Sequence, residues 1–131
     1  MNYSVAGDIV CDCLVIGGGP AGSVSASIIA EAGYDVVLIE RAIHPRPHVG
    51  ESLMPATNEV LEHLGVQSRI DDLKFIRKVG VQFVNAAGKA SSPFFFRKHD
   101  DRPDSETWHV DRATLDHCLF EVASEKGART M

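Results

Sequence analysis

Residues 13–41 read CLVIGGGPAGSVSASIIAEAGYDVVLIER, and this segment is the main basis for predicting the fold. Leu14–Ile16 is a short apolar run suited to a buried strand, and a glycine-rich turn follows it directly. Small and apolar residues then continue as a helix over 21–32, which ends at Gly33. Val36–Ile39 is a second buried strand. The segment predicts a strand–helix–strand unit, the beginning of a Rossmann-like α/β fold.

The glycines of this unit follow the G-x-G-x-x-G spacing of dinucleotide-binding loops. The first glycine permits a tight turn, the second lets the backbone approach a pyrophosphate, and the third allows close helix–strand packing. A proline can open the helix because its missing N–H would be unpaired there. The free N–H groups and positive dipole end of the helix favour phosphate. The residues expected to contact the cofactor here are Gly17, Gly19, Pro20, Ala21 and Gly22.

Glu40 follows the second strand at roughly the 20-residue offset at which a carboxylate accepts the hydroxyls of a ribose. A glycine triplet alone would be weak evidence. The strand, helix, second strand and terminal acid together favour dinucleotide binding over a coincidental glycine turn.

Composition narrows the class of protein and its partners. The chain has 131 residues, 44% hydrophobic and 24% charged, which is typical of one globular domain. The net charge of −5 and the scattered basic residues argue against nucleic acid or an anionic membrane as partner. No apolar run has the length of a membrane span and no signal pattern is present, so the cytoplasm is the default location.

The metal-binding residue types do not form a convincing site. Cys11, Cys13 and Cys118 are better explained as packed thiols than as a disulfide, redox or metal framework. His44 and His48 are four residues apart, but the surrounding prolines exclude the helix that would align them. We expect no metal.

The rest of the chain divides into further segments. The strand–helix–strand unit over about 9–41 is followed by a loop and helix over about 42–65, with Val60, Leu61 and Leu64 on its apolar side. A β-hairpin is expected over about 76–97 and a strand followed by a helix over about 107–127.

The last four residues, 128–131, are where a third parallel strand would begin, so we expect the N-terminal piece of a larger protein. In such a piece the apolar faces of Val36–Ile39 and of the last helix should be uncovered.

The motifs GGGPAG, Glu40–Arg41, PRPHVGES at 45–52 and VDRATLDHCL at 110–119 resemble those of the flavin-dependent halogenases and related FAD-dependent monooxygenases. The resemblance covers nearly the whole chain but only the N-terminal part of these longer proteins. It implies part of an FAD-binding Rossmann-like fold with an antiparallel β insertion. Pro47 departs from the pattern, because that branch more often has an aromatic residue there.

The resemblance implies several contacts with FAD. Arg41 would lie over the adenine, unless it is a solvated arginine at a strand end. The loop after it would run beside the isoalloxazine, or would only lead into a helix capped by Ser52. Arg112 would lie near the flavin. The residues implied in the loop are Arg46, His48, Gly50, Glu51 and Ser52.

Lys78 matches the lysine that stands after the second helix in halogenases of this type. The implied chemistry uses reduced flavin and O₂ to convert halide into hypohalous acid, which travels to the lysine. The lysine nitrogen then holds the electrophilic halogen beside an electron-rich substrate. The competing interpretation is an ordinary lysine at a strand edge. Trp108 and Phe94–Phe96 could line a tunnel, but aromatic residues on strands are more often core.

Three functions remain open. The first is an FAD-dependent halogenase acting on a small aromatic or carrier-protein-bound substrate, with a separate flavin reductase as a candidate partner. The second is an FAD-dependent hydroxylase or reductase of the same fold. The third is a truncated, non-catalytic fragment that binds nucleotide weakly or not at all; this piece alone is not expected to be a complete enzyme.

Overall fold

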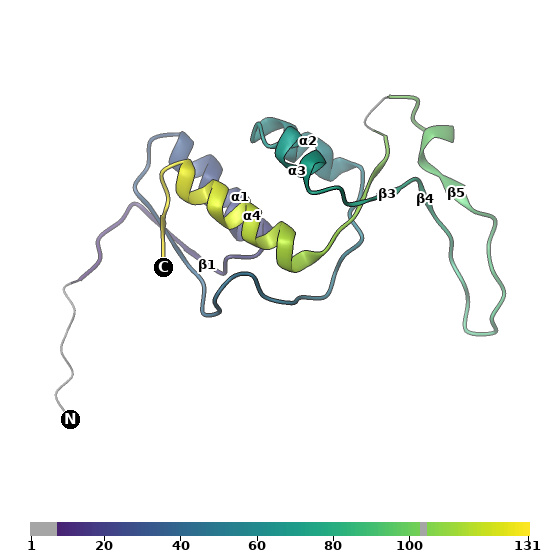
Figure 1. Ribbon diagram of the computed structural model, residues 1–131, viewed down its shortest axis with the longest axis horizontal. Helices are drawn as coiled ribbons and strands as arrows, with labels where there is room; N and C mark the ends of the chain where they lie inside the picture. The colour runs from purple at the N-terminus through teal and green to yellow at the C-terminus, as the bar shows by residue number, and fades with distance from the viewer. Residues whose placement is uncertain (1–7, 103–104) are drawn as a thin grey trace. The chain divides into compact units, whose positions relative to one another are not determined.

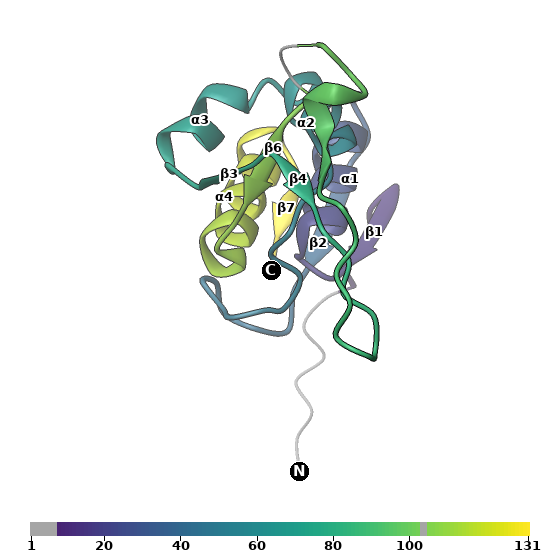
Figure 2. The ribbon, with the colours of Figure 1, turned by 90° about the vertical axis from the view of Figure 1, so that its right-hand side faces the viewer.

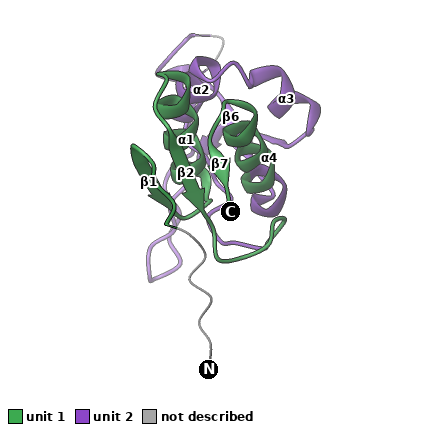
Figure 3. Ribbon diagram, turned by 90° about the vertical axis from the view of Figure 1, so that its left-hand side faces the viewer, with its two compact units in different colours: residues 1–46, 116–131 green, residues 47–115 purple. Residues whose placement is uncertain are grey.

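The computed structural model describes residues 8–102 and 105–131 (Figure 1). They form two compact units: one contains the chain up to Arg46 together with Asp116–Met131, and the other is Pro47–Leu115 (Figure 3). Helix α4, Arg112–Glu125, begins in the second unit and ends in the first.

The first unit is built on a parallel sheet of three strands. Strand β1 (Cys13–Ile16), helix α1 (Pro20–Glu31) and strand β2 (Val36–Ile39) follow one another, and β7 (Arg129–Thr130) ends the unit. The strand order is β1-β2-β7, with Cys13 opposite Val36 and Val37 opposite Arg129. The predicted strand–helix–strand unit is confirmed, and so is the third parallel strand near residue 128.

The core of this unit joins both helices to the central strand. Small residues let the backbones approach closely, as Ala26 on α1 and Ala123 on α4 are fully buried with Val36 and Leu38 of β2. Figure 2 shows α1 and α4 near β2.

The expectation that Val36–Ile39 and the α4 face would be uncovered is wrong. Val36, Val37 and Leu38 are at most 2% exposed because β2 lies between two strands, and the apolar stripe of α4 is buried as well. Within this sheet, exposed apolar side chains are found instead on β1, where Leu14 is 52% and Ile16 78% exposed.

The second unit contains short helices and two antiparallel strand pairs. Its helices are α2 (Ala56–His63), α3 (Gln67–Asp72) and the 3₁₀ turn η1 (Phe96–Lys98). Its strands are β3 (Ile76–Lys78), β4 (Gly80–Val81), β5 (Phe94–Phe95) and β6 (Thr107–His109).

The strand pairing of this unit differs from the single hairpin expected over about 76–97. Only β4 and β5 form that hairpin, whereas β3 pairs with β6, placing Ile76 opposite His109. Strand β6 contains the buried Thr107 and Trp108, so its backbone groups need a partner inside the protein. Strand β3 supplies that partner.

The apolar side of α2 was predicted only in part. Leu61 and Leu64 are 1% exposed, as expected, but Val60 is 38% exposed. The short helix α3, which the sequence did not predict, adds the fully buried Ile70 beyond α2.

Among the described residues, every helix is too short or too polar to cross a lipid bilayer.

Candidate functional site

The glycine loop between β1 and α1 presents backbone groups at a helix N-terminus. Gly17 has a positive φ of 106°, and its N–H donates to the carbonyl of Ile39 on β2. Gly19 is the N-cap residue in extended conformation, and Pro20 opens the helix. A Cβ on Gly22 would overlap the Gly17 carbonyl oxygen, so only glycine permits this close packing.

Such a loop provides what a pyrophosphate requires. The first turn of a helix has N–H groups without intrahelical partners, and its dipole favours negative charge. Ala21, on the first turn, is exposed. The backbone of the loop is open at Gly19. An added Cβ there would have one neighbour within 4 Å, Arg46 Nη2 at 3.8 Å.

Gly18 is the crowded member of the loop. A Cβ there would lie 2.7 and 2.8 Å from ring atoms of Phe120 on α4 and 2.9 Å from the Cβ of Glu40. The loop can therefore pass between α4 and the end of β2 only because this residue has no side chain. The G-x-G-x-x-G spacing leaves this position unspecified, although the run of three glycines was a signal in the sequence.

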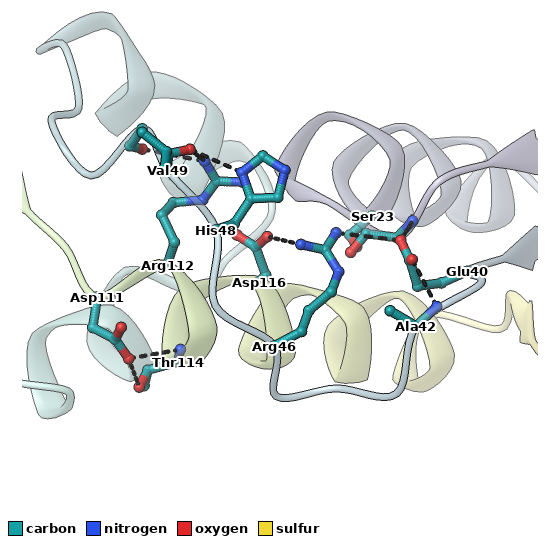
Figure 4. A network of polar contacts seen from close by, with 12 residues as sticks. Ser23, Glu40, Ala42, Arg46, His48, Val49, Asp111, Arg112, Thr114 and Asp116 are labelled. Carbon is teal, nitrogen blue, oxygen red and sulfur yellow. Dashed lines mark hydrogen bonds and ion pairs between the residues drawn. The ribbon is translucent and has the colours of Figure 1, made fainter.

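Glu40 is held by three donors at the end of β2 (Figure 4). Its Oε2 accepts from the Gly18 N–H at 2.8 Å, and its Oε1 accepts from the Ala42 N–H at 3.0 Å. The Arg46 guanidinium donates to Oε2 at 3.3 Å. The Ala42 bond, followed by Gly18 and Arg46, lowers the pKa of Glu40 to about 2 against the opposing effect of burial. Glu40 is a fixed anion beside the glycine loop.

Arg46 connects two carboxylates of the same unit. Its Nη2 pairs with Glu40, and its Nη1 lies 3.4 Å from Oδ2 of Asp116, a residue of α4 with a fully buried side chain. The planar guanidinium can donate to two acids at once, which a lysine cannot do in this geometry. Arg46 therefore lies between the Glu40 and Asp116 carboxylates and beside Gly19.

Asp116 is a site residue that sequence reasoning missed. It lies three residues before Leu119 and seven before Ala123, on the buried side of the predicted helix. A charged residue at such a position is almost never buried unless it is paired. An aspartate on the apolar side of a predicted helix was therefore the signal in the sequence that Asp116 has a buried partner.

In the second unit, Arg112 holds the loop that follows Pro47. Its Nη1 donates to the carbonyl oxygens of Val49 at 2.9 Å and Gly50 at 3.2 Å. Gly50 has a positive φ of 104°, and a Cβ there would lie 3.0 Å from Arg112 Nη1. Arg112 thus shapes the loop from the first turn of α4 (Figure 4).

The next residues of this loop extend along β6. The Val110 N–H donates to the carbonyl of Glu51, Ser52 forms an antiparallel bridge with His109, and the Glu51 carboxylate lies 3.5 Å from His109 Nε2. Ser52 lies in this bridge, whereas α2 begins only at Ala56 with Pro55 as N-cap. The strand pairing fixes the loop.

Two predicted contact residues are exposed. Arg41 follows Glu40 with an exposed side chain, and His48 is exposed with Nδ1 2.8 Å from the Val49 carbonyl oxygen. The structure leaves both accessible to a ligand.

Lys78 ends β3 with its ammonium turned toward the segment before α2. Nζ donates to the Leu53 carbonyl at 2.7 Å, lies 3.8 Å from the Met54 sulfur, and lies 5.5 Å from the centre of the Phe96 ring. Burial lowers the pKa of Lys78 below its ordinary 10.5, because a low-dielectric environment disfavours the charged form.

Lys78 also lines an open pocket of about 390 Å³ in the second unit. Phe94 and Phe95 line the same pocket, together with His109. The other tunnel candidates, Phe96 and Trp108, are 6% and 3% exposed and belong to the core. Over residues 8–102 and 105–131, no three His, Cys, Asp or Glu side chains are grouped to hold a metal ion.

Comparisons with known proteins agree with these features. Residues 12–96 match the family model described as tryptophan halogenase. A flavin-dependent halogenase of Armillaria mellea, armH5, is 40% identical over 116 residues, covering 88% of this chain and 22% of that protein. The 1H-pyrrole-2-carbonyl-[peptidyl-carrier protein] chlorinase of Pseudomonas fluorescens is 36% identical over 134 residues, covering 90% of this chain and 30% of that protein.

A solved structure extends the similarity to three dimensions. The myxobacterial chondrochloren halogenase CndH, described as a variant of FAD-dependent halogenases, superposes with a TM-score of 0.85 at 36% identity. The match covers 94% of this chain and 28% of that one. This chain therefore spans less than a third of the length of these relatives.

Proposed function

This chain belongs to the tryptophan halogenase family, and on that premise we propose that the whole protein is an FAD-dependent halogenase. The observation that carries the proposal is the fixed Glu40 anion beside a glycine loop and an open helix N-terminus. Within the family, this is the pairing that a dinucleotide cofactor needs at its adenosine end.

The residues present fit FAD. Gly17 and Gly19 leave space beside the backbone at the N-terminus of α1, and Gly22 allows the helix to pack closely on the loop. The N–H groups of Ala21 and Gly22, on the first turn, would be the donors to a pyrophosphate. A carboxylate has about four lone-pair positions, and the three donors on Glu40 leave capacity for a ribose hydroxyl. The exposed Arg41 side chain is free to cover the adenine.

The loop from His48 to Ser52 is proposed to run beside the isoalloxazine, supported by its fixed path. Arg112 and β6 hold its backbone, so Gly50, Glu51 and Ser52 can offer groups at defined positions. When bound and reduced, FAD supplies with O₂ the oxidising power that converts halide into hypohalous acid.

Lys78 is proposed to take the electrophilic halogen on its side-chain nitrogen. A lowered pKa increases the fraction of free amine, which is the nucleophilic form. The pocket with Phe94 and Phe95 gives an aromatic substrate apolar faces beside the same lysine. The side chain then delivers the halogen to the ring and regains a proton.

The substrates and protein partners are also proposals. Small electron-rich aromatics and carrier-protein-bound rings are the proposed substrates, because the Pseudomonas relative is a carrier-protein pyrrole chlorinase. A separate flavin reductase and a cytoplasmic location are predictions that accompany this function.

The test is an assay of the full-length protein with FAD, a reductant, O₂ and either chloride or bromide. A panel of phenols and pyrroles, free and carrier-bound, is analysed by mass spectrometry. Halogenated product supports the proposal. Hydroxylated product alone, with halide present, would favour a monooxygenase instead.

A further inference from the structure

A methionine, whose side chain can be oxidised, contacts the Lys78 nitrogen. The Met54 sulfur lies 3.8 Å from Lys78 Nζ, while the neighbouring Leu53 carbonyl accepts from the same nitrogen at 2.7 Å. The centre of the Phe96 ring lies 5.5 Å from the same nitrogen. The lysine is therefore held where its nitrogen meets a thioether.

A thioether is a soft nucleophile, and methionine is readily converted into its sulfoxide. A lysine that carries electrophilic halogen would hold the oxidant in contact with that sulfur. We propose that Met54 is a site of self-inflicted sulfoxidation, in which halogen carried by Lys78 passes to the Met54 sulfur when no substrate intercepts it. This inference rests on the proposed halogenase function.

The chemistry balances with hypohalous acid as the oxidant. The free amine of Lys78 exchanges one N–H hydrogen for chlorine and releases water. The Met54 sulfur then attacks chlorine, the N–Cl bond breaks, and the amine recovers a proton. Water adds to the chlorosulfonium group, chloride and protons leave, and the sulfoxide remains. The sulfur loses two electrons and the chlorine gains them.

Met131 provides a matched control within the same chain. Met54 is 55% exposed and Met131 is 51% exposed in this structure, so an oxidant in bulk solvent would have access to both residues. Met131 follows β7 in the first unit, whereas the Lys78 contact belongs to Met54. Preferential oxidation of Met54 that depends on Lys78 would therefore indicate transfer through this contact.

The experiment runs the full-length protein with FAD, a reductant, O₂ and chloride, without organic substrate, and maps methionine sulfoxide by peptide mass spectrometry. We expect severalfold more sulfoxide at Met54 than at Met131. Adding an electron-rich aromatic substrate that accepts the halogen, omitting chloride, or using the Lys78→Gln variant should each bring Met54 oxidation down to the level of Met131. Activity of Met54→Leu should decay more slowly during turnover.

The outcomes separate the two ideas. Equal oxidation of both methionines in a protein that halogenates its substrates would overturn the inference and leave the function standing. Preferential oxidation of Met54 that persists without chloride, or in Lys78→Gln, would also overturn it, since peroxide or free oxidant would then be responsible. Absence of any halogenated product would overturn the proposed function, and the inference with it.

Discussion

Glu40 and Lys78 each have a pKa below the ordinary value, but the consequences for their charge are opposite. Glu40 is lowered to about 2 because N–H donors from Ala42 and Gly18, and the Arg46 guanidinium, favour its anion. Lys78 is lowered because burial disfavours its cation. Hydrogen bonds make the first side chain a permanent charge, and burial makes the second more able to lose its proton.

This difference matches two kinds of task. A recognition group gains from a charge that does not change and from donors that fix its direction. A reactive amine needs access to its neutral form. The proposed roles are therefore cofactor recognition for Glu40 and halogen transfer for Lys78, and the following predictions test them.

The largest effect is expected for Lys78→Ala in the full-length protein. Halogenated product should disappear, while FAD binding and reductant-linked O₂ consumption continue, because Lys78 is not among the proposed cofactor contacts. The measurement compares product and O₂ consumption in one assay. Lys98→Ala is the matched control, since the Lys98 ammonium also lies over a phenylalanine ring, that of Phe95, at 5.2 Å. Wild-type halogenation by the Lys78 variant would make Lys78 a structural lysine.

Gly18→Ala should destabilise the glycine loop through contacts with distant residues. The added methyl would meet Phe120 and Glu40 at less than 3.0 Å, and overpacking of this kind costs about 1–3 kcal/mol. Urea unfolding measures the loss. Gly19→Ala is the comparison: its Cβ would have room, so stability should hold while FAD affinity falls. Equal stability of the two variants would mean that the loop adapts.

The low pKa of Glu40 predicts a pH dependence of stability. The folded-state pKa of about 2 is below the ordinary 4.5, so its contribution is complete above pH 4.5 and is lost as pH falls toward 2. When the pH falls from about 6 to about 3, the unfolding free energy of both proteins should decrease. The decrease should be smaller for Glu40→Gln, by about 1–2 kcal/mol, because this variant has no carboxylate at position 40 to protonate. Parallel pH curves for the two proteins would show that Glu40 is not held as described.

The smallest effect is expected for Arg46→Lys. A lysine can pair with Glu40 or Asp116 but does not bridge both, so FAD affinity should fall about threefold, less than 1 kcal/mol. Arg129→Lys alters another two-bond arginine pair, with Asp35 on the surface, and should leave FAD affinity unchanged. A larger loss of FAD affinity in Arg129→Lys than in Arg46→Lys would show that Arg46 does not contribute to FAD binding.

The sequence predicted the first unit well because its signals are local. Glycine spacing, a helix of small residues and two apolar runs fix β1, α1 and β2, and each can be recognised without knowing what packs on it. The pairing of β3 with β6 could not be predicted in this way, because it joins segments about thirty residues apart through the burial of Thr107 and Trp108.

The candidate site shows the same division. Glu40 could be placed from its offset to the glycines, whereas the roles of Gly18 and Asp116 depend on Phe120 and Arg46 approaching from distant parts of the chain. Arg112 was expected near the flavin, and the structure adds that it holds the Val49 and Gly50 carbonyls. The family pattern thus indicates which position is important, and the contacts in the structure explain what the residue does there.

The most direct test of the central claim is equilibrium dialysis of FAD against the full-length protein and its Glu40→Ala variant. Loss of a charge-assisted hydrogen bond to the ribose is worth about 1.5–3 kcal/mol, so affinity should fall at least about tenfold. Glu31→Ala, which removes a surface carboxylate paired with Lys126 at the end of α1, should bind FAD as the unsubstituted protein does. Unchanged affinity in Glu40→Ala would contradict the account.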